Sequence, residues 1–166
     1  MSLEYEQSDK YSTFTDPRDG KKYKTVKIGE QIWMAENLAY DAEGSVCYDN
    51  DPANGEKYGR LYSFGHIKES CPTGWHVPTR KEWNVLEKNL KAKSGFSALP
   101  AGYCDPKGKF HELGSVGTWW SYSVFHACSP IQVWITSTSP KRTGFISVED
   151  CYLFSIRCVK DSKEEK

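Results

Sequence analysis

Apolar and polar side chains alternate early in the chain. Residues 23–28 place Val26 and Ile28 on one face, and residues 31–34 return after a Gly-Glu turn. Alternation with a period of two, interrupted by a glycine turn, is typical of a β-hairpin. We therefore expect two antiparallel strands here, preceded by a polar tail over residues 1–15 that is disordered or derived from a tag.

The middle of the chain has a first helical pattern after a long polar stretch. Residues 37–55 are rich in Asp, Asn and Gly and predict a loop. In the next segment, Tyr58, Leu61 and Tyr62 fall at positions i, i+3 and i+4, which places them on one face of a helix. This spacing predicts a short helix over residues 58–68.

A second helix has the clearest boundary signal in the sequence. Thr79 and Glu82 form the capping box Thr-x-x-Glu, in which each side chain accepts a hydrogen bond from a free amide of the first turn. Trp83 and Leu86 then begin an apolar stripe. The pattern predicts an amphipathic helix that ends near the glycine at residue 95.

The second half of the chain favours β structure and long loops. No internal repeat, linker or second boundary interrupts it, so the sequence predicts one domain over residues 16–161 and a charged tail over residues 162–166. The expected strands cover residues 117–123, 131–136, 144–147 and 152–159.

Composition narrows the function classes. The 166 residues carry 22 basic and 22 acidic side chains, so a broad basic face for nucleic acid is not expected. No segment approaches the ~20 apolar residues of a membrane span. The 6 Trp, 10 Tyr and 7 Phe indicate a core that depends on aromatic packing, as in a loop-rich β domain.

The cysteines indicate the compartment. Six cysteines without a Cys-x-x-Cys pair are typical of disulfides formed in an oxidising environment, and six reduced thiols in the cytosol are the alternative. Six cysteines allow 15 pairings, so the sequence alone does not assign them. They are Cys47, Cys71, Cys104, Cys128, Cys151 and Cys158.

Seven segments together carry a family resemblance. They are residues 29–38 (GEQIWMAENL), 58–62 (YGRLY), 71–79 (CPTGWHVPT), 82–83 (EW), 99–102 (LPAG), 119–121 (WWS) and 157–161 (RCVKD). In this order they resemble the Fibrobacter succinogenes major paralogous domain family, over nearly all of residues 16–161. That family is similar to the formylglycine-generating-enzyme branch of the C-type lectin-like fold, and it is known mainly from bacterial surface or secreted proteins, often lipoproteins.

The resemblance implies an α+β protein of C-type lectin-like fold, with two helices packed on small antiparallel sheets and long loops. In such folds a cysteine of the helical half commonly pairs with one on the last strand, which here implies a Cys71–Cys158 disulfide. The family often has a cysteine where this chain has Gly55, so a short bridge from Cys47 to that position is excluded. The pairing of the other cysteines stays open.

Metal and cofactor sites find little support in the sequence. The sequence lacks the Glu-Pro-Asn and Trp-Asn-Asp triplets of calcium-dependent lectins. Residues 49–51 (DND) are typical of a turn. His66, Cys71 and His76 are evenly spaced, but a disulfide at Cys71 leaves only two histidines. We expect no metal and no cofactor.

Catalytic chemistry is also weakly supported. An oxidase of the formylglycine-generating type needs a redox-active cysteine pair, and Cys151 with Cys158 is the only close pair. A structural disulfide at Cys158 would leave Cys151 alone. No nucleophile elbow, phosphate loop or zinc-protease motif occurs, so no catalytic residue is assigned.

Aromatic residues supply the candidate ligand contacts. Trp119, Trp120 and Tyr122 lie on an expected strand, where neighbours face opposite sides. We expect one of the two tryptophans in the core and the other as a platform for sugar rings or peptide side chains. Trp134 is a fourth candidate.

Two arginines belong to segments that look buried. Arg60 and Arg157 are expected to be scaffold residues that hold loop carbonyls or a carboxylate, with Glu36 or Glu82 as the partner.

These observations favour a non-catalytic binding module, exported by a bacterium and either secreted, displayed on the surface or periplasmic. Its ligand is expected to be a glycan or a protein, met by the loops of residues 103–116 and 122–145. An oxidase and a purely structural surface domain are the alternatives. The signal or lipoprotein anchor is expected outside this sequence. The sequence does not indicate the oligomeric state.

Overall fold

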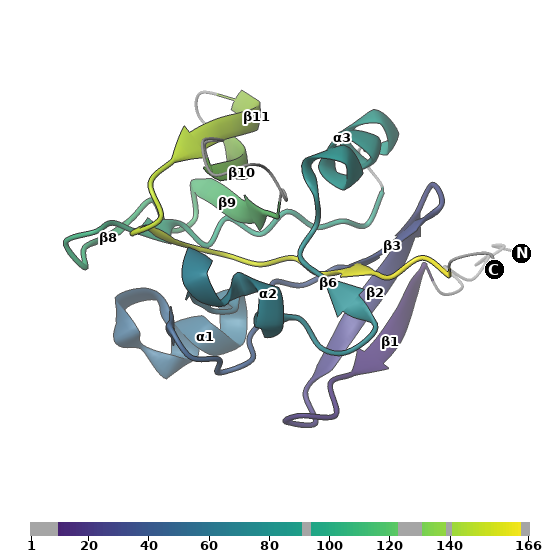
Figure 1. Ribbon diagram of the computed structural model, residues 1–166, viewed down its shortest axis with the longest axis horizontal. Helices are drawn as coiled ribbons and strands as arrows, with labels where there is room; N and C mark the ends of the chain where they lie inside the picture. Colours follow the sequence, from purple (N-terminus) through teal and green to yellow (C-terminus); the bar gives the residue numbers. More distant parts are fainter. Residues whose placement is uncertain (1–9, 91–93, 123–130, 139–140, 164–166) are drawn as a thin grey trace, which may run out of the picture.

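A computed structural model describes residues 10–90, 94–122, 131–138 and 141–163 of the chain. It has few helices and three antiparallel sheets (Figure 1). Order begins earlier than expected, because β1 (Tyr11–Thr15) pairs with β2 (Lys22–Ile28). The expected tail over residues 1–15 is therefore wrong in its last part, while residues 1–9 lie outside the described residues.

The first sheet joins the start of the chain to its end. The predicted hairpin is confirmed as β2 and β3 (Gln31–Met34). β13 (Val159–Lys160) pairs with β3 on one side and with β6 (Trp75–His76) on the other. The order is β1-β2-β3-β13-β6, so a strand of the last ten residues lies inside a sheet that begins with the N-terminal strands.

The helix expected over residues 58–68 is wrong over residues 59–63, whereas residues 64–68 are helical, in η2 (Phe64–His66) and α2 (Ile67–Ser70). α1 (Pro52–Tyr58) ends at Gly59, and β5 (Leu61–Ser63) follows. Gly59 has a φ of 77°, and a Cβ there would lie 2.6 Å from the Leu38 carbonyl oxygen, so the chain turns where only glycine fits. The helical spacing of these apolar residues was thus misleading.

Short elements surround this turn. Asp51 caps α1 by accepting a hydrogen bond from the Ala53 amide at 2.9 Å, which is the turn role expected for the Asp-rich segment. The neighbouring elements are β4 (Ser45–Val46), η1 (Tyr48–Asn50), η2 (Phe64–His66) and α2 (Ile67–Ser70).

The second predicted helix is confirmed as α3 (Arg80–Asn89). Both hydrogen bonds of the capping box between Thr79 and Glu82 are present. Trp83 and Leu86 face the core. The helix ends at Asn89, several residues before the glycine that the sequence indicated.

Two further sheets fill the second half. β9 (Val116–Ser121), β10 (Ile131–Thr138) and β11 (Lys141–Val148) form one of them. The other has the order β4-β5-β12-β7-β8, with β7 (Tyr103–Cys104), β8 (Phe110–His111) and β12 (Leu153–Phe154). The architecture is α+β with antiparallel sheets.

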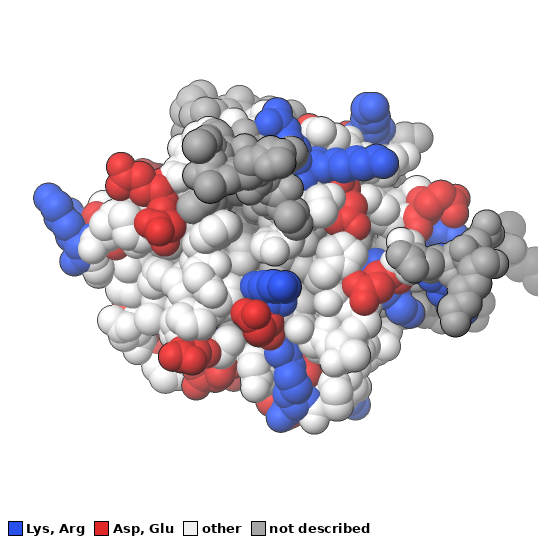
Figure 2. Space-filling model, in the orientation of Figure 1, with Lys and Arg blue, Asp and Glu red and all other residues white. Residues whose placement is uncertain are grey.

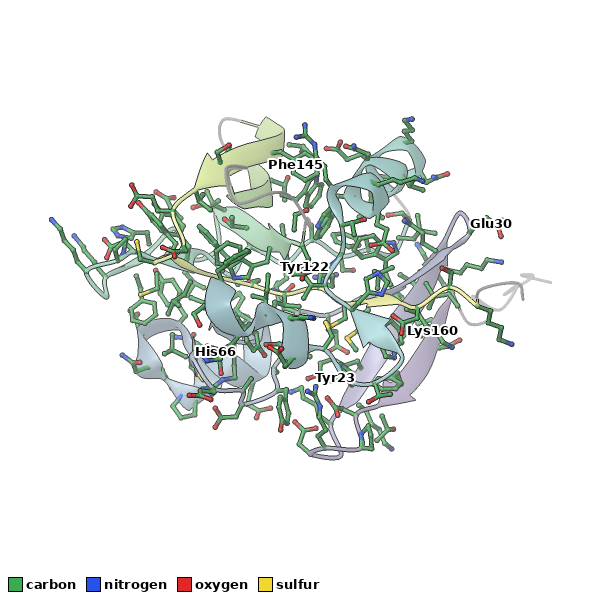
Figure 3. The ribbon with its side chains drawn as sticks, in the orientation of Figure 1. Tyr23, Glu30, His66, Tyr122, Phe145 and Lys160 are labelled. Carbon is green, nitrogen blue, oxygen red and sulfur yellow. A yellow bond between two sulfur atoms is a disulfide. The ribbon has the colours of Figure 1, made fainter. Side chains whose placement is uncertain are left out.

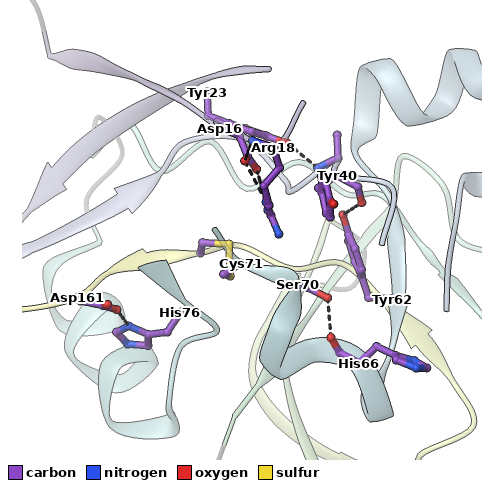
Figure 4. The surroundings of a disulfide bond; sticks show 12 residues. Asp16, Arg18, Tyr23, Tyr40, Tyr62, His66, Ser70, Cys71, His76 and Asp161 are labelled. Carbon is purple, nitrogen blue, oxygen red and sulfur yellow. Dashed lines mark hydrogen bonds and ion pairs between the residues drawn. A yellow bond between two sulfur atoms is a disulfide. The ribbon is translucent and has the colours of Figure 1, made fainter. Parts of the chain in front are cut away.

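The predicted disulfide is present. Cys71, which follows α2, is bonded to Cys158 next to β13, with the two Cα atoms 6.1 Å apart (Figure 4). It therefore ties the helical half to the end of the chain. Among the described cysteines, Cys47, Cys104 and Cys151 carry free thiols, and Cys128 lies outside the described residues.

β9 separates the two larger of the three hydrophobic clusters among the described residues. Trp119 packs into a cluster with Trp83, Phe96 and Trp134, whereas Trp120 packs into another with Tyr62 and Phe154. Neighbouring residues of a strand point to opposite faces, so the two tryptophans serve the two clusters. We call these regions the Trp119 side and the Trp120 side.

Candidate ligand-binding face

Three of the four candidate ligand contacts are buried. Trp119 and Trp120 have no exposed surface, and Trp134 is 1% exposed. The expectation that one of the first two faces solvent is wrong, because both faces of β9 are covered. Trp83 of α3 lies 6.4 Å from Trp119, and Phe64 of η2 lies 5.4 Å from Trp120, measured between ring centroids.

A polar network anchors the Trp119 side. The side-chain oxygen of Asn37 accepts hydrogen bonds from Trp119 Nε1 at 2.9 Å and from Arg157 Nε and Nη2 at 3.1 and 2.8 Å. The Asn37 amide nitrogen donates to the carbonyls of Tyr58 and Leu99. One buried asparagine therefore connects β9, the end of α1 and the chain before β13.

Arg157 is the scaffold residue that the sequence indicated, but its partner differs. The side chain is fully buried and donates to the carbonyls of Met34, Phe96 and Ser97. Burial lowers the pKa of its guanidinium to about 9, although the charge of Glu36 acts in the opposite direction, and no described carboxylate forms an ion pair with it. The expected partners Glu36 and Glu82 are thus replaced by Asn37 and backbone oxygens.

Arg60 also has a scaffold role. Its guanidinium donates to the Ser45 carbonyl at 3.0 Å and to Cys47 Sγ at 3.2 Å. Asp41 lies 2.8 Å from it and forms an ion pair. The three guanidinium nitrogens of Arg60 thus all contact side chains or backbone of the residues around β4.

On the Trp120 side, aromatic contacts lead from the core to the surface. Phe154 lies 4.8 Å from Trp120, and Tyr152 is parallel to Phe154 at 5.6 Å. Tyr103 lies 5.9 Å from Phe154 and 5.1 Å from His111. The outer rings are only partly buried, so they form a surface supported by buried rings.

We call the outer rings of Tyr103, His111 and Tyr152 the aromatic face, because the ring centroids of His111 and Tyr152 lie 5.1 and 6.0 Å from that of Tyr103. Figure 3 shows Tyr122 at the centre of the view, where its ring packs against the cluster that contains Trp120. In Figure 2, an area without charged side chains lies on this side, between α2 and β8. Within the described structure, the phenol oxygens of Tyr103, Tyr122 and Tyr152 make no hydrogen bond.

Polar groups border the aromatic face near β8. His111 Nε2 lies 2.7 Å from Asp105 Oδ2, and Asp105 also accepts from the amides of Lys107 and Lys109. The His111 hydrogen bond is the main reason that the pKa of Asp105 is lowered. Partial burial raises the pKa of the Tyr103 phenol.

Cys151 and Cys158, the close pair noted in the sequence, do not form a redox pair. Cys158 is buried and bonded to Cys71, so it is not available to pair with Cys151. Desolvation and the acidic neighbours Glu149 and Asp150 raise the pKa of the exposed Cys151 thiol. A raised pKa lowers the fraction of reactive thiolate.

His66 and His76 each have a side-chain partner. His76 lies between Glu82 Oε1 at 2.7 Å and Asp161 Oδ1 at 2.5 Å. His66 Nδ1 lies 3.0 Å from Ser63 Oγ. No group of three or more potential metal ligands occurs within the part of the chain that is described.

The chain matches one known family in part. Residues 26–94 match the model of the Fibrobacter succinogenes major domain. The match supports this family. It covers less than half of the chain, and neither a curated protein nor a solved structure matches. No helix of the described residues is long and apolar enough to cross a membrane.

The family segment supplies the scaffold rather than the outer rings. It contains β3, α1 and α3, while the aromatic face lies beyond residue 94. The sequence indicated the loops around Tyr103 and His111 but did not single out these residues. Tyr152 was missed because only the pairing of β12 with β7 places it beside Tyr103.

Proposed function

We propose that this chain is a non-catalytic, exported binding module of C-type lectin-like fold, and that its ligand is a glycan. The observation that carries the proposal is the aromatic face. Its rings are partly exposed, and buried Phe154, which packs on Trp120, holds Tyr103 and Tyr152 from behind. Its phenols have no partners among the described residues.

Such a surface has the chemistry that sugars require. The C–H faces of a pyranose ring stack on aromatic rings, while its hydroxyls need hydrogen-bond donors and acceptors nearby. Tyr103 and Tyr152, with centroids 6.0 Å apart, supply both ring surface and free hydroxyls. Because these rings are already positioned, a ligand loses little free energy in ordering them.

The architecture supports the fold part of the proposal. The first sheet contains strands from both ends of the chain, and the Cys71–Cys158 disulfide ties the helical half to the last strand. These are the features that the family resemblance implies for a C-type lectin-like domain. The disulfide also supports export to an oxidising compartment, where the domain would be secreted, periplasmic or attached to the surface.

An oxidase of the formylglycine-generating type is the alternative. It lacks support from the cysteines, since Cys158 is held by Cys71 and the environment of Cys151 disfavours a thiolate. A structural surface domain without a small ligand would not need unpartnered phenols at its surface.

Binding to a glycan array tests the proposal. The wild-type chain should bind a subset of glycans, and Tyr103→Ala and Tyr152→Ala should each weaken binding about tenfold, as expected for the loss of one stacking ring. Tyr11→Ala is the matched control, because Tyr11 is exposed on β1 and lies outside the aromatic face.

Unchanged binding in both face variants would contradict the assignment of this site. Capture of a protein ligand with the same two variants impaired, and no glycan bound, would replace the glycan by a protein partner.

A further inference from the structure

A separate hollow of about 650 Å³ lies between the start of α3 and the end of the described chain. Its apolar lining consists of Ile32 on β3, Val85 on α3 and Val159 on β13. Val159 is buried, whereas the other two side chains are partly exposed. The hollow therefore offers apolar surface that the fold leaves accessible.

Lysines border this apolar lining. Lys81, Lys160 and Lys163 are exposed and line the hollow, and within the described residues none has a carboxylate partner. Figure 3 shows Lys160 on β13 and Glu30 at the turn between β2 and β3. Glu30 is an acidic residue of the lining without a described partner.

The other two acidic residues of the lining are already engaged. Glu82 and Asp161 both bind His76, at 2.7 and 2.5 Å, and Figure 4 shows the contact with Asp161. The Asp161 amide also donates to the Gly74 carbonyl at 2.9 Å. His76 thus holds the wall formed by the chain after β13 and leaves the lysines in excess over free carboxylates.

We propose that this hollow binds a small organic anion with an apolar body. The apolar body lies on Ile32, Val85 and Val159, and the anionic group meets the ammonium groups of Lys81 and Lys160. The aliphatic stems of the lysines extend the apolar surface toward the charged heads. An apolar lining with a few convergent polar groups is the usual composition of a small-molecule site.

The site is independent of the aromatic face. No aromatic ring lines the hollow, so stacking of a sugar has no basis there. The expected ligand is a free molecule rather than a membrane lipid, since the lining is a hollow and not a flat basic patch.

Titration calorimetry with decanoate tests the proposal. We expect saturable binding of one decanoate per chain, with acetate and decyltrimethylammonium at least about tenfold weaker, because acetate lacks the apolar body and the cation has the wrong charge. The double variant Lys81→Glu and Lys160→Glu should weaken decanoate binding by at least about tenfold. Lys88→Glu is the matched control, since Lys88 is exposed on the same helix but does not line the hollow.

Equal affinity for decanoate and decyltrimethylammonium would overturn the proposal, as would wild-type affinity in the double variant. Binding to vesicles of anionic phospholipid without binding to decanoate would also overturn it in favour of a membrane surface. Circular dichroism of each variant separates lost binding from lost folding. Glycan binding by the double variant should stay unchanged, so this test and the glycan test can fail separately.

Discussion

On the Trp119 side of β9, buried hydrogen bonds to Asn37 and Arg157 hold the aromatic cluster in place. On the Trp120 side, the Cys71–Cys158 disulfide supplies the anchor, and aromatic contacts continue outward to partly exposed tyrosines. Residues 157 and 158 are neighbours, yet each serves a different side. Both sides contain a buried indole hydrogen bond, but only the Trp120 side contains a disulfide and continues to partly exposed rings.

This difference explains where a ligand could bind. On the Trp119 side, Trp119 Nε1 and the Nε and Nη2 atoms of Arg157 all donate to the side-chain oxygen of Asn37. These donors are therefore not available to a ligand. On the Trp120 side, Tyr103 and Tyr152 are partly exposed, and among the described residues their phenols make no hydrogen bond. These phenols are therefore available to a ligand.

The largest expected effect is loss of the disulfide. Replacing Cys71 and Cys158 by Ala opens a loop with a sequence separation of 87 residues. On the chain-entropy model this lowers the free energy of unfolding by up to about 4–5 kcal/mol. Urea unfolding with and without reductant measures it, and a reductant effect that persists in the double variant would show that another bridge matters.

Arg157→Met should cost about 3 kcal/mol. The variant keeps the volume but leaves the buried oxygens of Asn37, Phe96 and Ser97 without their charged donor. Urea unfolding of the variant under reducing conditions tests whether the two anchors act separately. Lys88→Met, at an exposed position of α3, is the control. Equal stability of both variants would show that Arg157 does not stabilise the Trp119 side.

Trp119→Phe and Trp120→Phe should each cost about 1–3 kcal/mol, because each loses a buried indole hydrogen bond and some volume. Only Trp120→Phe should also weaken glycan binding, since Trp120 supports Phe154, which packs against the aromatic face. Thermal unfolding and the glycan array together check this. Equal loss of glycan binding in both variants would contradict the prediction that only the Trp120 side supports the ligand.

The smallest effect concerns pH and His76, which lies outside both clusters. Its hydrogen bonds to Glu82 and Asp161 raise its pKa from 6.5 to about 9, despite partial burial, which acts in the opposite direction. The resulting stabilisation is fully present below about pH 6.5 and is lost as pH rises through about 9. We expect about 1 kcal/mol, since the side chain is 37% exposed and solvent screens the interaction.

The pH dependence of unfolding between these limits measures this contribution. His76→Gln should flatten the slope, whereas Asn84→Gln, which changes an exposed residue of α3 without removing a titratable group, should not. An unchanged slope in the first variant would remove the role of His76.

Local signals in the sequence predicted α3 and the β2–β3 hairpin well. The capping box of Thr79 and Glu82 is complete within four residues, and the hairpin strands are adjacent in the chain. The helix expected over residues 58–68 failed in its first part, because Leu61 and Tyr62 are buried on a strand after Gly59. Tertiary packing overrode the local period there.

The candidate site was predicted less well than the fold. Alternation along β9 correctly separated Trp119 from Trp120, but it could not show that both faces are covered. Tyr103 lies on β7 and Tyr152 lies directly before β12, almost 50 residues further along the chain. No local pattern therefore pairs them. The loops expected to carry specificity do contain Tyr103 and His111, while Cys128 and residues 123–130 lie outside the described residues.

By itself, the sequence determined the hairpin, the capped helix and the arginine scaffold, since each depends on residue types within one short segment or motif. The family resemblance added the Cys71–Cys158 pairing. Only the tertiary structure decided that both neighbouring tryptophans are buried, that Asn37 is the partner of Arg157, and that the tyrosines of β7 and the chain before β12 meet at the surface. These facts depend on contacts between distant strands, and long-range packing of that kind leaves no periodic signal along the chain.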